Sequence, residues 1–147
     1  LALRQVSVVV VQVTGEERFL DLAAFFIDQR GQRPEQHYGF ARPGYAQDRM
    51  PVRQETEAIG HAVRAVYLYA AMADMARLRN DEPLQAACRR MFDSISLRRM
   101  YVTGGIGSSH AGEAFTLDYD LPNAAAYAEI SKEPPSGNPG VPVQLGA

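Results

Sequence analysis

The sequence predicts an all-α protein built from helical hairpins, because three long segments show helical periodicity. These segments are Thr14–Arg30, Glu55–Arg79 and Asp81–Arg99. In each of them apolar side chains recur three or four residues apart, which places them on one face of a helix. The length of 147 residues suits about one small domain.

The first helix has a recognisable beginning and end. Thr14 and Glu17 have the spacing of a capping box, in which each side chain bonds a free backbone N–H group of the first turn. Gly31 stands where a left-handed residue ends a helix. The expected apolar face carries Phe19, Leu22, Ala23, Phe26 and Ile27. Before this helix, Leu1–Val13 is rich in β-branched residues, which suits a strand, although a packed helix is equally compatible.

The second and third helices are predicted to follow each other as part of the helical hairpins. Pro51 precedes the second helix, which ends near Arg79-Asn80, and Asp81-Glu82-Pro83 begins the third with proline in its first turn. The apolar stripe predicted for the second helix contains Ile59, Val63, Val66, Tyr67, Ala70 and Ala73. The stripe predicted for the third contains Leu84, Cys88, Met91, Phe92 and Ile95.

Two segments share a plan that suggests an internal repeat. Gly15–Asp28 and Asn80–Asp93 both have an acidic start, an apolar fifth residue and a final aspartate. Repeated hairpins of this kind build helical toroids and solenoids. A chance likeness between two amphipathic helices is equally compatible.

The remaining segments are expected to be irregular, with one exception. Gln32–Met50 contains two prolines and two glycines and is predicted to be a long loop. Asn123 can cap a short helix that runs to Glu129. Residues 132–147 are rich in proline and glycine, so the prediction divides the chain into a helical domain, 1–131, and a tail, 132–147.

The charge and cysteine content narrow the range of partners. A net charge of −2, with acids and bases mixed, gives no electrostatic case for nucleic acid or an anionic membrane. No apolar run, Val8–Val11 included, is long enough to span a bilayer. Cys88 is the single cysteine, so no disulfide can form within the chain. Secretion gains no support, and a cytoplasmic location is favoured.

The stretch YVTGGIGSSHAGEAF, Tyr101–Phe115, places four glycines around one carboxylate, Glu113. A phosphate-binding loop is one interpretation, but the Gly-Lys-Ser/Thr ending of a P-loop is missing and the stretch follows a helix. A glycine-rich connection with a solvated Glu113 is the plainer alternative.

Three stretches resemble a known family. YVTGGIGSSHAGEAFTLDYDLPNAAAYAE, PVRQETEAIGHAVRAVYLYAAMADMA and VTGEERFLDLAAFFIDQRG are similar to the β-L-arabinofuranosidases of glycoside hydrolase family 127. The similarity extends from about Val11 to Glu129. It implies that the helical hairpins form part of an (α/α)6 barrel. It also implies a retaining hydrolase of terminal β-L-arabinofuranosyl sugars.

The resemblance assigns roles to three residues. Glu113 in GEAF matches the general acid/base, and enclosure by a tight loop would raise the pKa of such a carboxyl. His61 in GHAVRA matches a histidine that lines the sugar subsite, although a lone helical histidine is more often structural. Glu129 in YAE matches a glutamate ligand of the family's zinc.

The zinc ligands are where the sequence departs from the family. The resemblance implies three cysteines beside Glu129, one of them the nucleophile. Ile130-Ser131 replaces the first of these, and Cys88, on an apolar helical stripe, cannot stand in for them. We therefore expect these 147 residues to bind no zinc and to show no turnover. An inactive helical remnant, a sugar-binding module or an interaction module remain alternatives, with self-association through exposed apolar faces.

Overall fold

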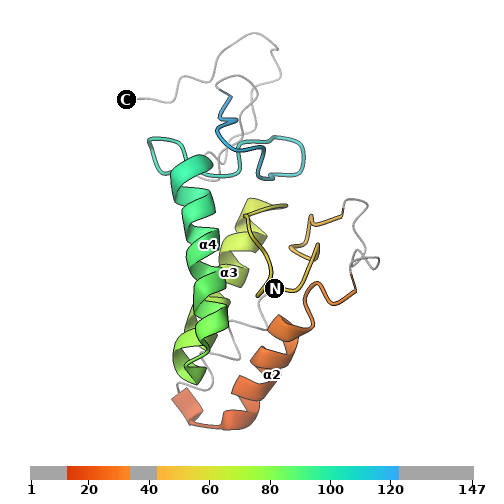
Figure 1. The fold of residues 1–147 in the computed structure, drawn as a ribbon, viewed down its shortest axis with the longest axis vertical. Coiled ribbons are helices and arrows are strands. Elements are labelled where there is room, and N and C mark those ends of the chain that lie inside the picture. Colours follow the sequence, from red (N-terminus) through yellow and green to blue (C-terminus); the bar gives the residue numbers. More distant parts are fainter. Residues whose placement is uncertain (1–12, 34–42, 123–147) are drawn as a thin grey trace.

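The computed structural model describes residues 13–33 and 43–122. In this part of the chain the regular elements are α2 (Glu17–Asp28), α3 (Ala62–Arg79) and α4 (Glu82–Arg98). The described residues contain isolated β-bridges but no strand. Figure 1 shows α3 and α4 side by side, with α2 near the end at which α3 passes into α4. The predicted all-α class is therefore confirmed as a mostly helical fold.

The α3–α4 hairpin follows from the residues at its turn. Asn80 adopts left-handed backbone angles, with φ at 52°, and ends α3. Asparagine tolerates this conformation better than most residues. The carboxylate of Asp81 then accepts a hydrogen bond from the N–H of Leu84 at 2.9 Å and caps α4. Because the stop and the start are adjacent, the chain reverses within two residues, as predicted.

The apolar face predicted for α3 is wrong in its register. The buried residues of α3 are Ala62, Ala65, Leu68, Ala71, Met72, Met75 and Ala76. Tyr67, from the predicted stripe, is 47% exposed. Because α3 is apolar over most of its circumference, periodicity alone does not single out one face. The core is formed by small and flexible side chains of α3 against Ile27 of α2 and Leu84 of α4.

The starts of the first two predicted helices also differ from the structure. The capping box does not form: Glu16 is the N-cap of α2, and the hydroxyl of Thr14 accepts from the N–H of Glu16. The second helix begins at Ala62, not at Glu55, after His61 as its N-cap. Gly60 explains part of this shift. Its φ is +72°, and a Cβ there would lie 2.4 Å from the carbonyl oxygens of Gly44 and Tyr45.

The suggested internal repeat does not extend to the packing. Ile27 in the first segment is fully buried, whereas the equivalent Phe92 in the second is 69% exposed. Phe92 is also the residue that departs from the face predicted for α4. The two segments therefore bury different positions, which favours a chance likeness between amphipathic helices.

Several predictions concern residues that the structure does not describe or properties that it does not test. Almost all of Leu1–Val13 lies outside the described residues, as do the helix expected at Asn123–Glu129 and the tail at 132–147. The division into domains therefore stays a prediction. No described helix is long and apolar enough to cross a membrane. Large apolar side chains such as Phe25, Leu97 and Val102 are exposed, and self-association stays a prediction.

Candidate active site

Two segments that lie far apart in the sequence are joined at the N-terminus of α3. The N–H of Ala62 donates to the carbonyl of Glu113 at 2.9 Å, and the N–H of Phe115 donates to that of Gly60 at 2.9 Å. These bonds surround an antiparallel bridge between His61 and Ala114. Residues 57–62 and 113–118 are called the paired segment below. It attaches the loop that follows α4 to the beginning of α3.

The paired segment brings together two of the sequence-predicted site residues. Nε2 of His61 lies 3.0 Å from Oε2 of Glu113. The His61 side chain is 13% exposed and that of Glu113 is 46% exposed. The expectation that the glycine loop encloses the carboxyl is therefore wrong within the described residues. One oxygen of the carboxylate contacts the imidazole, and nearly half of the Glu113 side chain is exposed to solvent.

Glycines allow the loop to approach α3 this closely. Gly107 has φ at +75°, and a Cβ there would lie 2.7 Å from the Cβ of Ala62. Gly112 has φ at +81°, and a Cβ there would lie 3.0 Å from the ring of Tyr45. Glu113 itself has φ at 50°, a left-handed conformation that is costly for a residue with a side chain. The glycines therefore let the loop backbone lie close to Ala62 and Tyr45. This agrees with the plainer alternative, a glycine-rich connection.

His61 is oriented by its neighbours on the protein side. Its backbone N–H donates to the carbonyl of Tyr45 at 3.0 Å. The ring of Tyr45 meets the imidazole edge to face, with 5.7 Å between the ring centroids. Nδ1 of His61 is buried and has no hydrogen-bond partner among the described residues. In the neutral imidazole, a proton on Nε2 would therefore be donated to the Glu113 carboxylate, with Nδ1 as the unprotonated nitrogen.

Gln47 holds the segment that carries Tyr45. It is buried, and its Nε2 lies 3.2, 3.0 and 3.1 Å from the carbonyl oxygens of Tyr45, Ile59 and His61. One amide group thus connects the 44–47 turn to the residues that lead into α3. Sequence reasoning missed both Tyr45 and Gln47, because they lie in a segment without periodicity.

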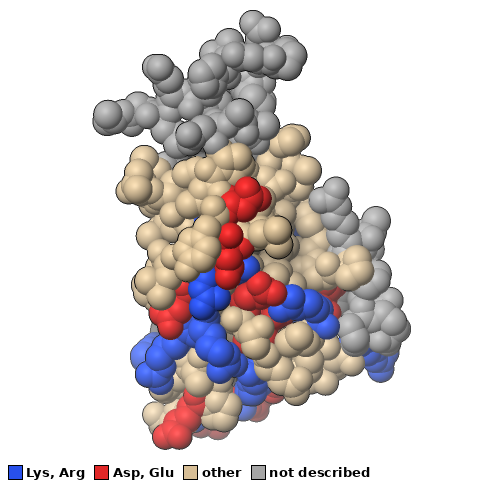
Figure 2. Space-filling model, turned by 45° about the horizontal axis from the view of Figure 1, so that its top comes forward, with Lys and Arg blue, Asp and Glu red and all other residues tan. Residues whose placement is uncertain are grey.

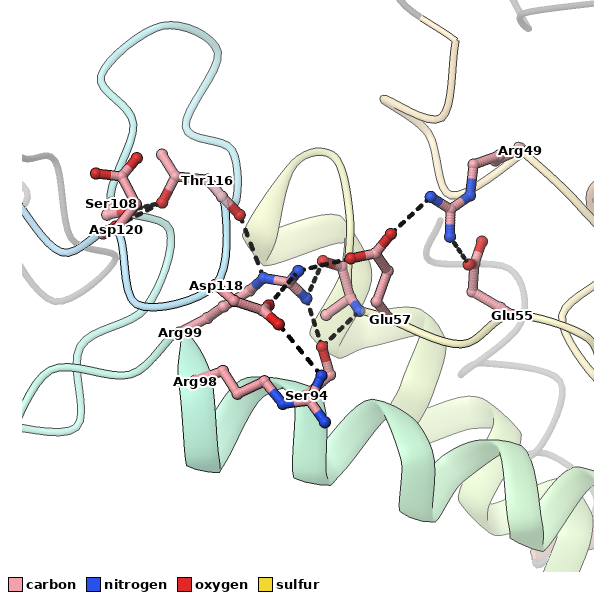
Figure 3. A network of polar contacts seen from close by, with 11 residues as sticks. Arg49, Glu55, Glu57, Ser94, Arg98, Arg99, Ser108, Thr116, Asp118 and Asp120 are labelled. Atoms are coloured by element: carbon pink, nitrogen blue, oxygen red, sulfur yellow. Dashed lines mark hydrogen bonds and ion pairs between the residues drawn. The ribbon is translucent and has the colours of Figure 1, made fainter.

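Arg99 joins the two halves of the paired segment through Ala58 and Thr116. Sequence reasoning missed this residue as well. Its side chain is 4% exposed, yet all five of its N–H groups have acceptors. Nε donates to the carbonyl of Thr116 at 3.2 Å, and Nη1 donates to that of Ala58 at 3.0 Å and to the Ser94 hydroxyl. Nη2 lies 2.7 Å from Glu57 and 2.6 Å from Asp118, on opposite sides of the pairing (Figure 3).

The ion pairs continue from Arg99 toward the 49–55 segment. Glu57 also accepts from Arg49 at 2.8 Å, and Arg49 contacts Glu55 in turn (Figure 3). Hydrogen bonds from Arg49 and Arg99 hold the pKa of Glu57 below its usual range. Figure 2 shows the same mixture at the surface, where acidic and basic side chains alternate across the middle of the face in view. This face presents no large patch of a single charge.

A cavity of about 370 Å³ lies beside the Arg99 end of the paired segment. Its lining residues are Glu57, Ala58, Ile59, Arg99, Phe115, Thr116, Leu117 and Asp120. Ile59 lies two positions before His61, and Phe115 lies two positions after Glu113. The volume falls within the range of small-molecule sites.

The described residues offer no site that fits zinc. They contain no group of three or more His, Cys, Asp or Glu side chains that could hold a metal ion. Cys88 packs beside the apolar core, and burial raises the pKa of its thiol, which is the opposite of what a metal-bound thiolate requires. Glu129 lies outside the described residues.

A mostly helical fold in which a histidine at the start of α3 meets a carboxylate on a glycine-rich loop defines a candidate site for acid–base chemistry. The model of the β-L-arabinofuranosidase catalytic domain, glycoside hydrolase family 127, matches residues 3–131. The chain therefore belongs to this family, as the sequence motifs indicated.

Individual relatives agree with this assignment. The chain is 44% identical over 131 residues to a non-reducing end β-L-arabinofuranosidase of Bifidobacterium longum subsp. longum, an alignment that covers 79% of this chain and 20% of that protein. A crystal structure of a β-L-arabinofuranosidase from Geobacillus stearothermophilus T6 superposes with a TM-score of 0.77 at 43% identity, covering 85% of this chain and 22% of the other. A second family 127 β-arabinofuranosidase structure gives a TM-score of 0.75 at 43% identity, covering 84% and 19%. The chain thus spans about a fifth of the length of these relatives.

Proposed function

We propose that the chain carries the acid–base part of a glycoside hydrolase site for terminal β-L-arabinofuranosyl groups, with Glu113 as the general acid/base. The observation that carries this proposal is the 3.0 Å contact between Glu113 and His61 on the paired segment. In the protonated form, Glu113 would donate a proton to the glycosidic oxygen as the sugar leaves. In the ionised form, it would accept a proton from the incoming water.

His61 has two roles in this proposal. It orients the Glu113 carboxylate through Nε2, and its ring forms part of the wall against which the sugar lies. The strained backbone of Glu113 supports a functional role for this residue, since such strain tends to persist at sites where it serves a purpose. We also propose that the hairpins belong to an (α/α)6 barrel, in keeping with their similarity to family 127 catalytic domains.

We expect sugar binding by this chain but no hydrolysis. The family resemblance implies a thiolate nucleophile, and the described residues provide no activated cysteine. We therefore expect the 147-residue chain to bind methyl β-L-arabinofuranoside but not to hydrolyse an aryl β-L-arabinofuranoside, with or without added zinc. A catalytically inactive helical remnant or interaction module is the second candidate, and the large exposed apolar side chains favour it.

Calorimetric titration with methyl β-L-arabinofuranoside tests the first candidate. Glu113→Gln and His61→Ala should each weaken binding by about tenfold, because each removes a hydrogen-bonding group from the site. His110→Ala is the matched control, since His110 is an exposed histidine of the same loop. Absence of binding, or equal losses in all three variants, would favour the inactive remnant. Hydrolysis that disappears in Glu113→Gln would show that the chain needs no thiolate.

A further inference from the structure

Tyr45 contacts both of the segments that carry the His61–Glu113 pair. On the α3 side, its ring meets the His61 imidazole edge to face, with 5.7 Å between the centroids. On the loop side, a Cβ at Gly112 would lie 3.0 Å from Cε2 of Tyr45, so the backbone that leads into Glu113 packs against the same ring. One rigid ring therefore lies against the two carriers of the pair.

Other contacts hold Tyr45 itself in place. Its backbone carbonyl accepts from the N–H of His61 at 3.0 Å and from Nε2 of Gln47 at 3.2 Å. The guanidinium carbon of Arg64, in the first turn of α3, lies over the Tyr45 ring, 5.4 Å from its centroid. A cation in this position is attracted by the electron-rich face of the ring. Tyr45 is therefore fixed both through its backbone and through its side chain.

The His61–Glu113 contact needs support of this kind. The bond from the N–H of Ala62 to the carbonyl of Glu113 fixes the backbone of the loop, but it does not orient either side chain. Nδ1 of His61 has no hydrogen-bond partner in the part of the chain that the structure describes, so no second hydrogen bond of the imidazole fixes its rotation. The Tyr45 ring is the neighbour that limits this rotation.

We propose that Tyr45 is a positioning residue of the acid–base site. Its ring lies between the His61 imidazole and the Gly112 backbone, and it thereby holds the side chains of His61 and Glu113 in contact. This inference rests on the proposed function, because the contact serves catalysis only if Glu113 is the acid/base. Tyr45 acts through the pair and transfers no proton to or from the sugar.

Replacing the ring tests this role in the 147-residue chain. A nuclear Overhauser effect between the His61 ring protons and the Glu113 methylene protons reports whether the two side chains are in contact. The effect should persist in Tyr45→Phe, which keeps the ring, and disappear in Tyr45→Leu. The Kd for methyl β-L-arabinofuranoside should rise about tenfold in Tyr45→Leu and by less than about twofold in Tyr45→Phe. Tyr67→Leu, at a half-exposed tyrosine of α3, is the matched control and should alter neither quantity.

A second variant disturbs the same contact from the loop side and serves if Tyr45→Leu does not fold. The methyl group added in Gly112→Ala would meet the Tyr45 ring, so the Overhauser effect should weaken and the Kd should rise. Gly104→Ala is its matched control. Gly104 has a similar left-handed φ, +86°, but a Cβ there would have no atom within 4 Å. Gly104→Ala should therefore leave the effect and the Kd unchanged.

The outcomes separate this inference from the proposed function. If Tyr45→Leu lowers stability in urea but leaves the Overhauser effect and the Kd unchanged, Tyr45 is only a structural residue and the inference is wrong. The same conclusion follows if Tyr45→Phe loses both as fully as Tyr45→Leu, or if Gly112→Ala behaves like Gly104→Ala. If the unsubstituted chain shows the effect but binds no sugar, the proposed function fails, while the dependence of the His61–Glu113 contact on Tyr45 can still be measured and stands or falls on the Overhauser effect.

Discussion

Replacing Arg99 with lysine should destabilise the protein by about 2–6 kcal/mol. Lysine keeps the charge but has three N–H donors, whereas the guanidinium of Arg99 uses five. The carbonyls of Ala58 and Thr116 have no other hydrogen-bond donor among the described residues. Leaving a buried polar group unsatisfied costs about 1–3 kcal/mol, so the loss of both partners accounts for the expected range.

The neighbouring Arg98 provides a matched control for this prediction. It also contacts Asp118, at 3.2 Å, but its side chain is 44% exposed. Arg98→Lys should therefore change the free energy of unfolding by less than about 0.5 kcal/mol. Urea unfolding followed by circular dichroism, with the slope compared between variants, gives both values. If the two variants differ by less than about 0.5 kcal/mol, the five-contact account of Arg99 is wrong.

Four further outcomes follow from the structure. Gln47→Glu should lower the free energy of unfolding in urea by about 2 kcal/mol or more, because a carboxylate would face three carbonyl oxygens, whereas the exposed Gln54→Glu should cost little. The lowered pKa of Glu57 means that its stabilisation is present above the ordinary value of 4.5 and is lost as pH falls through the folded-state pKa, so Glu57→Gln should flatten the acid side of a stability–pH curve. Glu113→Gly should be more stable than Glu113→Gln by about 1 kcal/mol in thermal unfolding, because glycine relieves the left-handed backbone, and equal stabilities would argue against strain there. Cys88 should react with iodoacetamide more slowly in the folded protein than in urea, since burial raises the pKa of its thiol, and equal rates would show that the thiol is accessible.

The parts of the fold that the sequence predicted depend on short-range chemistry. Asn80, Asp81 and Pro83 act within one turn of themselves, so the α3–α4 reversal could be located without knowledge of the packing. The same holds for Gly31, which has a left-handed φ shortly after α2 ends at Asp28. The start of α3 was misplaced because Glu55–Gly60 is compatible with a helix in isolation. It is held in an irregular conformation by contacts with Arg99, Ser94 and the 44–47 turn.

The candidate site was predicted unevenly for a similar reason. Glu113 and His61 were selected through the family resemblance, and no spacing rule joins residues so far apart in the chain. Tyr45, Gln47 and Arg99 were missed because each is an ordinary residue type in its local sequence. Their importance comes from convergence: a buried side chain meets acceptors from two or three distant segments. Arg99, for example, follows another arginine, and only burial distinguishes the two.

The most direct test of the account is an amide chemical-shift map of the 147-residue chain titrated with methyl β-L-arabinofuranoside. We expect saturable shifts at residues 60–62 and 112–114, which carry the His61–Glu113 pair, and the loss of these shifts in Glu113→Gln. Saturable shifts confined to other residues, or shifts that persist unchanged in Glu113→Gln, would contradict the assignment of this pair as the acid–base site.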